Sequence, residues 1–331
     1  MPFWQGPFSL AVKLCYRSFP MSLEVFVLGT GGMMPLPHRH LTSALVRREG
    51  DLFLFDCGEG TQVSLKKLNL RWKKISAIFI SHTHADHVTG LPGMLMLSSQ
   101  VDRTDPLYLI GPPRLKEYYE VNRRSLEMYV NYEIIVHEIS NPSEPQVVFK
   151  GDGYQVRSFP LNHSRVCVGY TLEEELRPGI FHPEKARELG VPMGPLWAQL
   201  QAGQAVTVEG RTVTSESVLG PPRPGVKFSY VTDTAPLASI PGEVKGSDLL
   251  LCEGMFTRDL EAGAREKKHL TSTQAAEMAS QAGGVASLGL FHYSPRCNEK
   301  ELKRLLTEAR EVFPNAFLAR DGQIIDLPNH D

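Results

Sequence analysis

The sequence has no long apolar run, and nothing in it approaches the ~20 consecutive apolar residues that a membrane-spanning helix requires. It also has no excess of positive charge, because 35 Lys and Arg stand against 37 Asp and Glu. The net charge is −2, so any contact with nucleic acid must be a local basic patch. These absences exclude a membrane-spanning protein and a generally basic nucleic-acid coat protein.

Cysteines are few, and none are arranged in a Cys-x-x-Cys pair. An odd number of scattered cysteines does not fit the disulfide framework of a small secreted protein. The cysteine pattern therefore favours a reducing compartment, and we expect a cytoplasmic protein. The five cysteines are Cys15, Cys57, Cys167, Cys252 and Cys297.

What is present is enough apolar material for a large core. The 331 residues are 42% hydrophobic and include 15 Phe, 10 Tyr and 3 Trp. This composition excludes a disordered or fibrous chain. The length fits two average domains or one layered α/β domain.

Residues 1–20 have neither a long apolar segment nor a clear small-residue cleavage site, so they do not resemble a signal peptide. The first predicted strand, 23–28, begins just after Met21. We expect 1–20 to be a disordered extension, or Met21 to be the biological initiator, with the folded domain spanning 21–331. The alternative is a packed terminal arm anchored by Trp4 and Phe8.

From residue 23 onward, short apolar runs alternate with turns and helical patterns, which predicts two sheets packed face to face with helices outside. Residues 174–225 contain much Pro and Gly and few strand-like runs, so they are interpreted as an insertion. Predicted strands are 23–28, 42–47, 52–55, 77–81, 107–110, 134–139, 147–150, 154–159, 168–173, 227–231, 248–252, 287–291, 316–319 and 323–327; predicted helices are 60–68, 90–99, 113–121, 183–189, 272–282 and 299–312.

A cluster of ligand-type side chains follows the predicted strand 77–81. It consists of His82, His84, Asp86 and His87. Their spacing does not fall on one helical face, but a loop at a strand end can fold all four inward. Imidazole suits zinc, and carboxylate suits zinc or manganese. The alternative is a polar loop whose histidines only form hydrogen bonds.

Three more candidate ligands lie at other strand ends. His163 follows the predicted strand 154–159, Asp233 follows 227–231, and His292 follows 287–291. Each alone would more often be a solvated loop residue. Together with the first cluster they supply what a two-metal site needs, including a carboxylate able to bridge.

Several longer strings accompany these ligands. They are Val-Leu-Gly-Thr-Gly-Gly at 27–32, Asp-Cys-Gly-Glu-Gly-Thr-Gln at 56–62, Gly-Leu-Pro-Gly at 90–93, Asn-His-Ser at 162–164, Gly-Tyr at 169–170, Thr-Asp-Thr at 232–234, His-Leu-Thr-Ser-Thr-Gln-Ala-Ala at 269–276 and His-Tyr-Ser-Pro-Arg at 292–296. With them the chain resembles, over roughly 23–327, the short form of ribonuclease Z, the tRNA 3′-processing endonuclease family of the metallo-β-lactamase superfamily. The string at 56–62 is more specific than the metal motif. The resemblance implies an αββα sandwich with an inserted, protruding arm.

The resemblance also implies the ligands of two zinc ions per subunit. His82, His84 and His163 would hold one ion, Asp86, His87 and His292 the other, with Asp233 as the bridge. In this family the residue at Asp86 also accepts the proton of the attacking water.

His269 and Glu253 resemble the family's His–Glu pair, which protonates the departing sugar oxygen. The alternative is that His269 only caps the helix that follows it and Glu253 is solvated. Around Glu253 the chain departs from the family, because Cys-Glu-Gly-Met at 252–255 stands where His-Glu-Ala-Thr is usual.

The substrate loop departs as well. The family commonly has Pro-x-Lys-x-Arg-Asn, whereas 35–40 keeps Pro35 and Arg39 but not the lysine and asparagine. Arg39 is the candidate substrate contact here. The departure leaves open the cleavage position and the treatment of a mature CCA end.

Residues 174–225 resemble the family's arm that grips the tRNA elbow. The likeness rests on Gly and Pro at 190–195, and Gly194 and Pro195 are candidate substrate contacts. Basic residues here are sparse and diluted by acidic ones. The alternative is that this stretch packs on the core, anchored by Leu196, Trp197 and Leu200.

The leading hypothesis is therefore a cytoplasmic, dinuclear-zinc endoribonuclease that removes the 3′ trailer from precursor tRNA and leaves a 3′-hydroxyl. The resemblance implies a homodimer in which each subunit presents its arm to tRNA bound at the other. The first alternative is a related phosphodiesterase or 3′ exoribonuclease acting on other RNA or small diesters. A hydrolase of esters or lactams would have no reason for the arm or the His–Glu pair, and a non-catalytic tRNA-binding subunit would not need every ligand.

Overall fold

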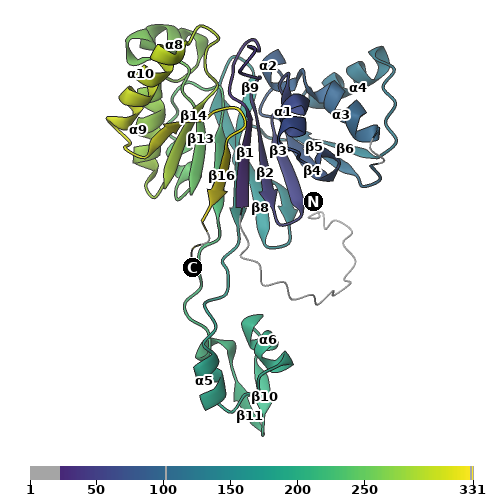
Figure 1. The fold of residues 1–331 in the computed structure, drawn as a ribbon, viewed down its shortest axis with the longest axis vertical. Coiled ribbons are helices and arrows are strands. Elements are labelled where there is room, and N and C mark those ends of the chain that lie inside the picture. The colour runs from purple at the N-terminus through teal and green to yellow at the C-terminus, as the bar shows by residue number, and fades with distance from the viewer. Residues whose placement is uncertain (1–22, 101–102, 329, 331) are drawn as a thin grey trace.

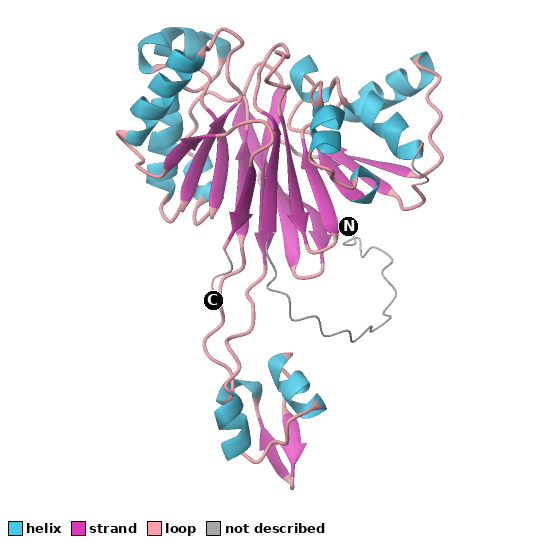
Figure 2. Ribbon diagram, in the orientation of Figure 1, coloured by secondary structure: helices cyan, strands magenta, loops and turns pink. Residues whose placement is uncertain are grey.

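The computed structural model describes residues 23–100, 103–328 and 330, so the predicted extension 1–20 lies outside the described residues. Two seven-stranded sheets pack face to face, with helices on both outer faces and an arm projecting below (Figures 1 and 2). The predicted αββα sandwich is confirmed.

The first sheet contains six strands from the N-terminal half and one from the C-terminus. Its strand order is β16-β1-β2-β3-β4-β5-β6. The bounds are β1 (Leu23–Gly29), β2 (Ser43–Arg48), β3 (Asp51–Phe55), β4 (Ile75–Phe79), β5 (Leu107–Gly111), β6 (Ile134–Glu138) and β16 (Ile324–Leu327).

The second sheet is built from the middle and the end of the chain. Its order is β15-β14-β13-β12-β9-β8-β7. The bounds are β7 (Gln146–Gly151), β8 (Tyr154–Asn162), β9 (Val166–Glu174), β12 (Lys227–Val231), β13 (Leu249–Glu253), β14 (Ser287–Phe291) and β15 (Ala316–Leu318).

Strand β3 shows how the sequence produces the layers. Successive side chains of a strand point to opposite faces. Phe53 and Phe55 therefore enter the core between the sheets, whereas Leu52 and Leu54 enter the core under the helices. Both faces are apolar, so the strand is a continuous hydrophobic run rather than an alternating one.

Helices cover both outer faces, and none in the described ranges is long and apolar enough to cross a bilayer. Two of them start with capping boxes, at Thr271 for α9 and at Asn298 for α10. On the first sheet lie α1 (Thr61–Lys67), α2 (Ala85–Val88), α3 (Leu91–Ser99) and α4 (Leu115–Ser125); on the second lie α7 (Ile240–Val244), α8 (Glu261–Lys267), α9 (Ser272–Ala282) and α10 (Glu299–Arg310). The short 3-10 turns in the described part of the chain are η1 (Trp72–Lys74), η2 (Ser215–Ser217) and η3 (Arg258–Leu260).

The arm leaves the second sheet between β9 and β12. Its two strands keep the register of the sheet. Tyr170 pairs with Tyr230, and the isolated bridges Arg177–Arg223 and Phe181–Leu219 lie further out by the same number of residues on both strands. We call residues 174–181 and 219–226 the stalk. The stalk is thus a sparse continuation of the β9–β12 ladder.

Residues 182–218, the head of the arm, have a small core of their own. It contains Ala186, Val191, Leu200, Val206, Val213 and Val218, with Leu196 and Trp197 packed against it. The alternative that Leu196, Trp197 and Leu200 anchor the segment to the sandwich is therefore wrong. The head contains α5 (Pro183–Glu188), α6 (Pro195–Gln201), β10 (Val206–Val208) and β11 (Arg211–Val213), of which only α5 was predicted.

Candidate metal centre

The first group of predicted ligands comes from three loops at one end of the sandwich. His82 and His84 follow β4, His163 follows β8, and Asp233 follows β12. Their ligand atoms lie within 4.8 Å of one another. Nδ1 of His84 is 3.0 Å from Nε2 of His82 and 3.2 Å from Nε2 of His163. Oδ2 of Asp233 lies 3.7 and 3.6 Å from the same two Nε2 atoms.

The second group shares Asp233 with the first. Its members are Asp86, His87, Asp233 and His292, again within 4.8 Å. Here the other oxygen of Asp233 is used: Oδ1 lies 3.3 Å from Nε2 of His87 and 3.1 Å from Nε2 of His292. Oδ2 of Asp86 is 3.3 Å from Nε2 of His292. One carboxylate thus faces both groups with different oxygens, as a bridge must.

Asp86 and His87 lie in the short helix α2 rather than in a loop. The helix begins with His84 as its N-terminal flanking residue, in extended conformation. The turn brings Asp86 beneath the loop after β1, where its Oδ2 accepts a hydrogen bond from the backbone N–H of Met33 at 2.8 Å.

The donor set fits a cation at each group. Nε2 of His87 is buried without a hydrogen-bond partner, although it faces Asp86 and Asp233. Burial would lower the pKa of His87, but Asp233, Asp86 and Asp56 raise it well above its usual value, so the carboxylates attract a positive charge here.

His82 and Asp233 hold the protonation states that metal binding requires. Burial, and to a smaller extent the nearby His87, holds the pKa of His82 well below its usual value, so the imidazole of His82 is neutral. Burial would raise the pKa of Asp233, but His292 and His87 keep it well below its usual range. A neutral imidazole beside an ionised carboxylate suits zinc binding.

Asp56 orients His87 and was not singled out as a site residue from the sequence. Its Oδ2 lies 2.8 Å from Nδ1 of His87 and accepts hydrogen bonds from the hydroxyls of Ser81 and Tyr230. The Ser81 backbone N–H donates to Oδ1. Such outer contacts fix the tautomer and direction of a ligand imidazole. The only sequence signal for Asp56 was its place in the string at 56–62.

Lys268 plays the same part for His163. Its backbone carbonyl oxygen lies 3.1 Å from Nδ1 of His163, and its Nζ donates to the carbonyl oxygen of His163. Lys268 adopts a left-handed conformation with φ of 56°. Nothing in the sequence pattern indicated this contact.

His269 and Glu253 form the predicted pair. Nδ1 of His269 lies 3.1 Å from both carboxylate oxygens of Glu253, which is fully buried at the end of β13. Burial would lower the pKa of His269, but the carboxylate of Glu253 raises it to about 9. Nε2 of His269 points to the metal groups, 4.0 Å from Oδ2 of Asp233. Glu253 is not solvated, so that alternative is wrong.

Arg39 lies near the metal groups, but the protein itself uses its guanidinium. It donates to the carbonyl oxygens of Ser294 and Cys297 at 3.2 and 3.3 Å and lies over the ring of Tyr293. Arg39 therefore ties its loop to the loop after His292. Gly194 and Pro195 are at the start of α6 in the head of the arm, away from the metal groups.

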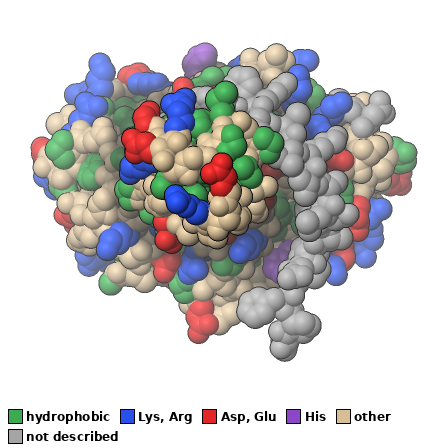
Figure 3. Space-filling view, turned by 90° about the horizontal axis from the view of Figure 1, so that it is seen from below, with side chains coloured by type: hydrophobic (Ala, Val, Ile, Leu, Met, Phe, Trp, Pro, Cys, Tyr) green, Lys and Arg blue, Asp and Glu red, His purple; other side chains and the backbone are tan. Residues whose placement is uncertain are grey.

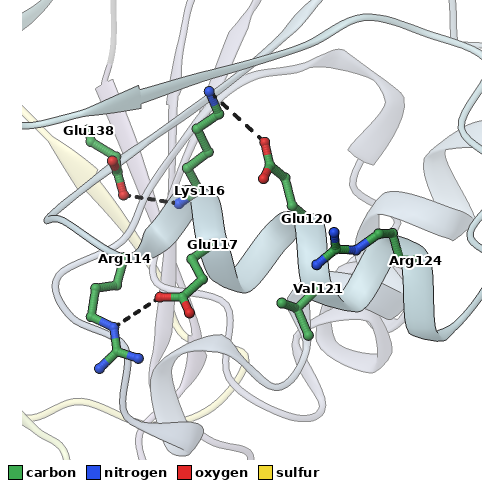
Figure 4. A pocket seen from close by; sticks show the side chains of 7 residues that line it. All are labelled: Arg114, Lys116, Glu117, Glu120, Val121, Arg124 and Glu138. Carbon is green, nitrogen blue, oxygen red and sulfur yellow. Dashed lines mark hydrogen bonds and ion pairs between the residues drawn. The ribbon is translucent and has the colours of Figure 1, made fainter.

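A surface hollow of about 390 Å³ lies on α4 (Figure 4). Four of its charged side chains form two ion pairs, Arg114 with Glu117 at 3.1 Å and Lys116 with Glu120 at 4.0 Å. Glu138 accepts from the backbone N–H of Lys116. Because the paired charges of α4 are exposed and already have partners, the hollow is a weaker candidate site than the histidine groups.

Comparison with known proteins finds relatives that match nearly the full length of the chain. Ribonuclease Z of Treponema denticola is 61% identical over 312 residues, covering 94% of this chain and 100% of that protein. Ribonuclease Z of Borreliella burgdorferi is 40% identical over 311 residues, covering 92% and 97%. A family model described as anti-Pycsar protein Apyc1 matches residues 23–166, which end before Asp233 and His292. The short form of human tRNase Z superposes with a TM-score of 0.67 at 23% identity, covering 92% of this chain and 99% of that one, and shows the shared fold.

Proposed function

The chain belongs to the ribonuclease Z family, a family of phosphodiester-hydrolysing endonucleases, and from this premise we propose that it is a zinc-dependent enzyme that removes the 3′ trailer from precursor tRNA. The observation that carries the proposal is the convergence of seven predicted ligands into two groups that share Asp233. The tRNA would keep a 3′-hydroxyl. We propose the cytoplasm as its location, because the described cysteines are free thiols.

His82, His84 and His163 would hold one zinc ion, and Asp86, His87 and His292 the other, with Asp233 between them. Two bound zinc ions would make a water molecule acidic enough to lose a proton and so to attack a phosphodiester. They would also offset the negative charge on the oxygens of the phosphodiester. Asp86 accepts the proton of the attacking water, and the Met33 N–H keeps its carboxylate in place.

His269 acts at the other side of the scissile bond. Glu253 holds its Nδ1, so the proton available for transfer is on Nε2, which faces the metal groups. When the bond between phosphorus and the 3′ oxygen of the tRNA breaks, His269 gives that oxygen its proton. The trailer keeps the phosphate. A pKa of about 9 keeps His269 protonated at neutral pH.

The position of the arm supports a homodimer. The stalk leaves from one end of β9 and β12, and the metal groups lie at the other end of the same strands (Figure 1). The head is therefore far from the metal groups of its own subunit, and we propose that it serves the partner subunit. Val63 on α1 and Met96 on α3 are exposed on contacting helices, which offers apolar surface for that contact.

A local basic patch supports an RNA substrate despite the net negative charge. Residues 66–74 carry five exposed cations and no acidic residue, and Lys74 makes a loose ion pair with Asp105 at 3.5 Å. Figure 3, which views the molecule from below, shows basic side chains interspersed with acidic ones on this lower face. The cations of the patch are Lys66, Lys67, Arg71, Lys73 and Lys74.

Cleavage of one precursor tRNA, with both new ends mapped, tests the activity. We expect a single internal cut that leaves a tRNA 3′-hydroxyl and an intact trailer. Release of mononucleotides would indicate the 3′ exoribonuclease alternative, and cleavage of small diesters alone would indicate a general phosphodiesterase. Elemental analysis should find two zinc ions per chain; one or none after zinc reconstitution would contradict the dinuclear site.

Subunit mixing tests the homodimer. One variant is Asp86→Ala with its arm intact, and the other is an armless chain in which Asn-Gly replaces 175–225. Each alone should process precursor tRNA poorly. Co-expressed, they should recover activity, because a mixed dimer combines one arm with the partner's intact site. No recovery in isolated mixed dimers would show that the arm does not serve the partner.

A further inference from the structure

A buried ion pair lies at the base of the arm. Nε of Arg48, the last residue of β2, donates to Oε1 of Glu174, the last residue of β9, at 2.8 Å. The side chains of Arg48 and Glu174 are only 8% and 4% exposed. Since β2 belongs to the first sheet and β9 to the second, the pair links the two sheets at the point where the arm leaves.

The pair holds both strands of the stalk. Oε2 of Glu174 accepts a hydrogen bond from the backbone N–H of Val226 at 3.1 Å, while the Glu174 N–H donates to the Val226 carbonyl oxygen. Gly225 packs so closely that an added Cβ would lie 2.5 Å from Cβ of Glu174. On its other side, the guanidinium of Arg48 lies over the ring of Tyr154, 4.7 Å from its centroid.

Glu175 still contacts the sandwich, because its N–H donates to the carbonyl oxygen of Gly153 at 2.9 Å and its carboxylate pairs with Lys150 at 3.7 Å. Further out, the two strands of the stalk bond to each other. Its strands meet at the isolated bridges Arg177–Arg223 and Phe181–Leu219, and Pro and Gly occupy much of the rest. The head has its own core. A small tilt at the base is therefore multiplied into a large displacement of the head.

From this we propose that Arg48 and Glu174 are positioning residues that set the direction of the arm and hence the affinity for the large substrate. The inference rests on the proposed function, because it concerns how the arm presents precursor tRNA. Neither residue touches the reacting atoms. Binding energy from a remote part of a substrate acts only when that part is held in the right place.

The test compares Arg48→Met with the neighbouring variant Arg47→Met. Arg47 makes the matched control, since it pairs with Glu24 within the first sheet and does not contact the stalk. For Arg48→Met we expect KM for precursor tRNA to rise about tenfold with kcat nearly constant. Hydrolysis of bis(p-nitrophenyl) phosphate should change less than about twofold, because this substrate does not reach the arm. Arg47→Met should behave as the wild type.

Hydrogen exchange gives a readout independent of tRNA. In Arg48→Met, amides of 175–181 and 219–226 should exchange faster, while those of β13 keep their protection. Arg48→Lys should recover part of the KM effect, since it restores the charge without the planar guanidinium. Unchanged KM and exchange in Arg48→Met would overturn the proposal, as would an equal loss on both substrates with faster exchange in β13.

If Arg48→Met does not fold, Glu174→Gln takes its place. This variant removes the charge but keeps an oxygen that can accept the Val226 N–H, so KM should rise in the same direction by a smaller factor. An unchanged KM there would also overturn the proposal. If the wild type does not cleave precursor tRNA, the proposed function fails, whereas the exchange of the stalk amides still tests the ion pair.

Discussion

The two ends of β9 and β12 carry opposite kinds of structure. At one end Asp233 and His163 are 2% and 8% exposed, and each is held by several polar neighbours. At the other end the strands continue as a stalk in which Leu176 and Ile180 are 73% and 52% exposed. The same pair of strands is thus enclosed where it supports the metal groups and open where it supports the arm.

The two ends meet different requirements, namely precise positioning at the metal groups and reach at the arm. Reacting groups have to be held within a fraction of an ångström, so their positions are determined by many contacts at once. Under the proposed function the arm reaches a large substrate, and its head has a core separate from that of the sandwich. Damage at the first end should affect every substrate, and damage at the second only large ones.

The largest effect is expected at the enclosed end, from Asp86→Ala. Turnover of both precursor tRNA and bis(p-nitrophenyl) phosphate should fall below detection, because the change removes a proposed ligand and the proposed base together. Steady-state assays on both substrates, with elemental analysis, check this. Asp259→Ala, which breaks an exposed ion pair with Arg304, is the control and should leave both rates unchanged. Substantial turnover of Asp86→Ala would remove this residue from the mechanism.

His269→Ala should separate protonation of the leaving oxygen from the attack of water, since both steps are assigned to the enclosed end of β9 and β12. We expect it to retain both metal ions and to slow precursor tRNA cleavage by ~10²–10⁴-fold, the usual contribution of a general acid. Bis(p-nitrophenyl) phosphate should be slowed far less, since p-nitrophenolate leaves without a proton. Single-turnover rates on both substrates measure the contrast. Equal slowing, or loss of metal, would contradict the assigned role.

Replacing 175–225 by Asn-Gly removes the open end altogether. Glu174 and Val226 remain paired, and Asn-Gly suits a two-residue hairpin turn. We expect KM for precursor tRNA to rise by more than about tenfold, while hydrolysis of the small diester continues, because no proposed ligand is lost. Steady-state kinetics on both substrates test this prediction, and the melting temperature shows whether the shortened chain is folded. A parallel fall in both activities in a folded protein would show that the arm also supports the metal groups.

The smallest expected effect compares two fully buried leucines. Leu200 lies in the core of the head and Leu251 in the core between the sheets. Each Leu→Ala change removes about 2–5 kcal/mol of local stability. Leu251→Ala should lower the main melting temperature, whereas Leu200→Ala should leave it unchanged and make the head sensitive to proteolysis. Thermal unfolding followed by circular dichroism, with limited proteolysis, measures both. A lowered main transition in Leu200→Ala would show that head and sandwich unfold together.

The sequence predicted the sandwich well where patterns are strong. Strands β12 and β14 and helix α9 begin and end at the residues expected, because apolar runs between clear turn signals determine their limits. The candidate ligands could be predicted because their residue types follow such runs. The strand before His163 was expected to end at Phe159, but β8 continues to Asn162. β7 pairs only as far as Ser158, so Pro160 lies where the strand has one neighbour and an absent N–H can be tolerated.

What the sequence could not predict depends on contacts between distant residues. Helix α2 is too short to show a helical period, so Asp86 was placed in a loop. The tie between Arg39 and the carbonyl oxygen of Ser294, and that between Asp56 and Tyr230, join positions far apart in the chain. Helix α6 and the β10–β11 hairpin were missed because a core of only six buried apolar residues, spread over short elements, leaves little periodic pattern.

Because the register of the stalk is unbroken, the length of the arm can change only in defined steps. Each residue added to both strands would carry the head about 3.3 Å further out, and would also turn each added side chain to the opposite face of the ribbon. Only matched insertions of two residues per strand lengthen the arm and keep its orientation. Changes in the span between the head and the sandwich are therefore expected in steps of about 7 Å, in engineered chains as in natural relatives.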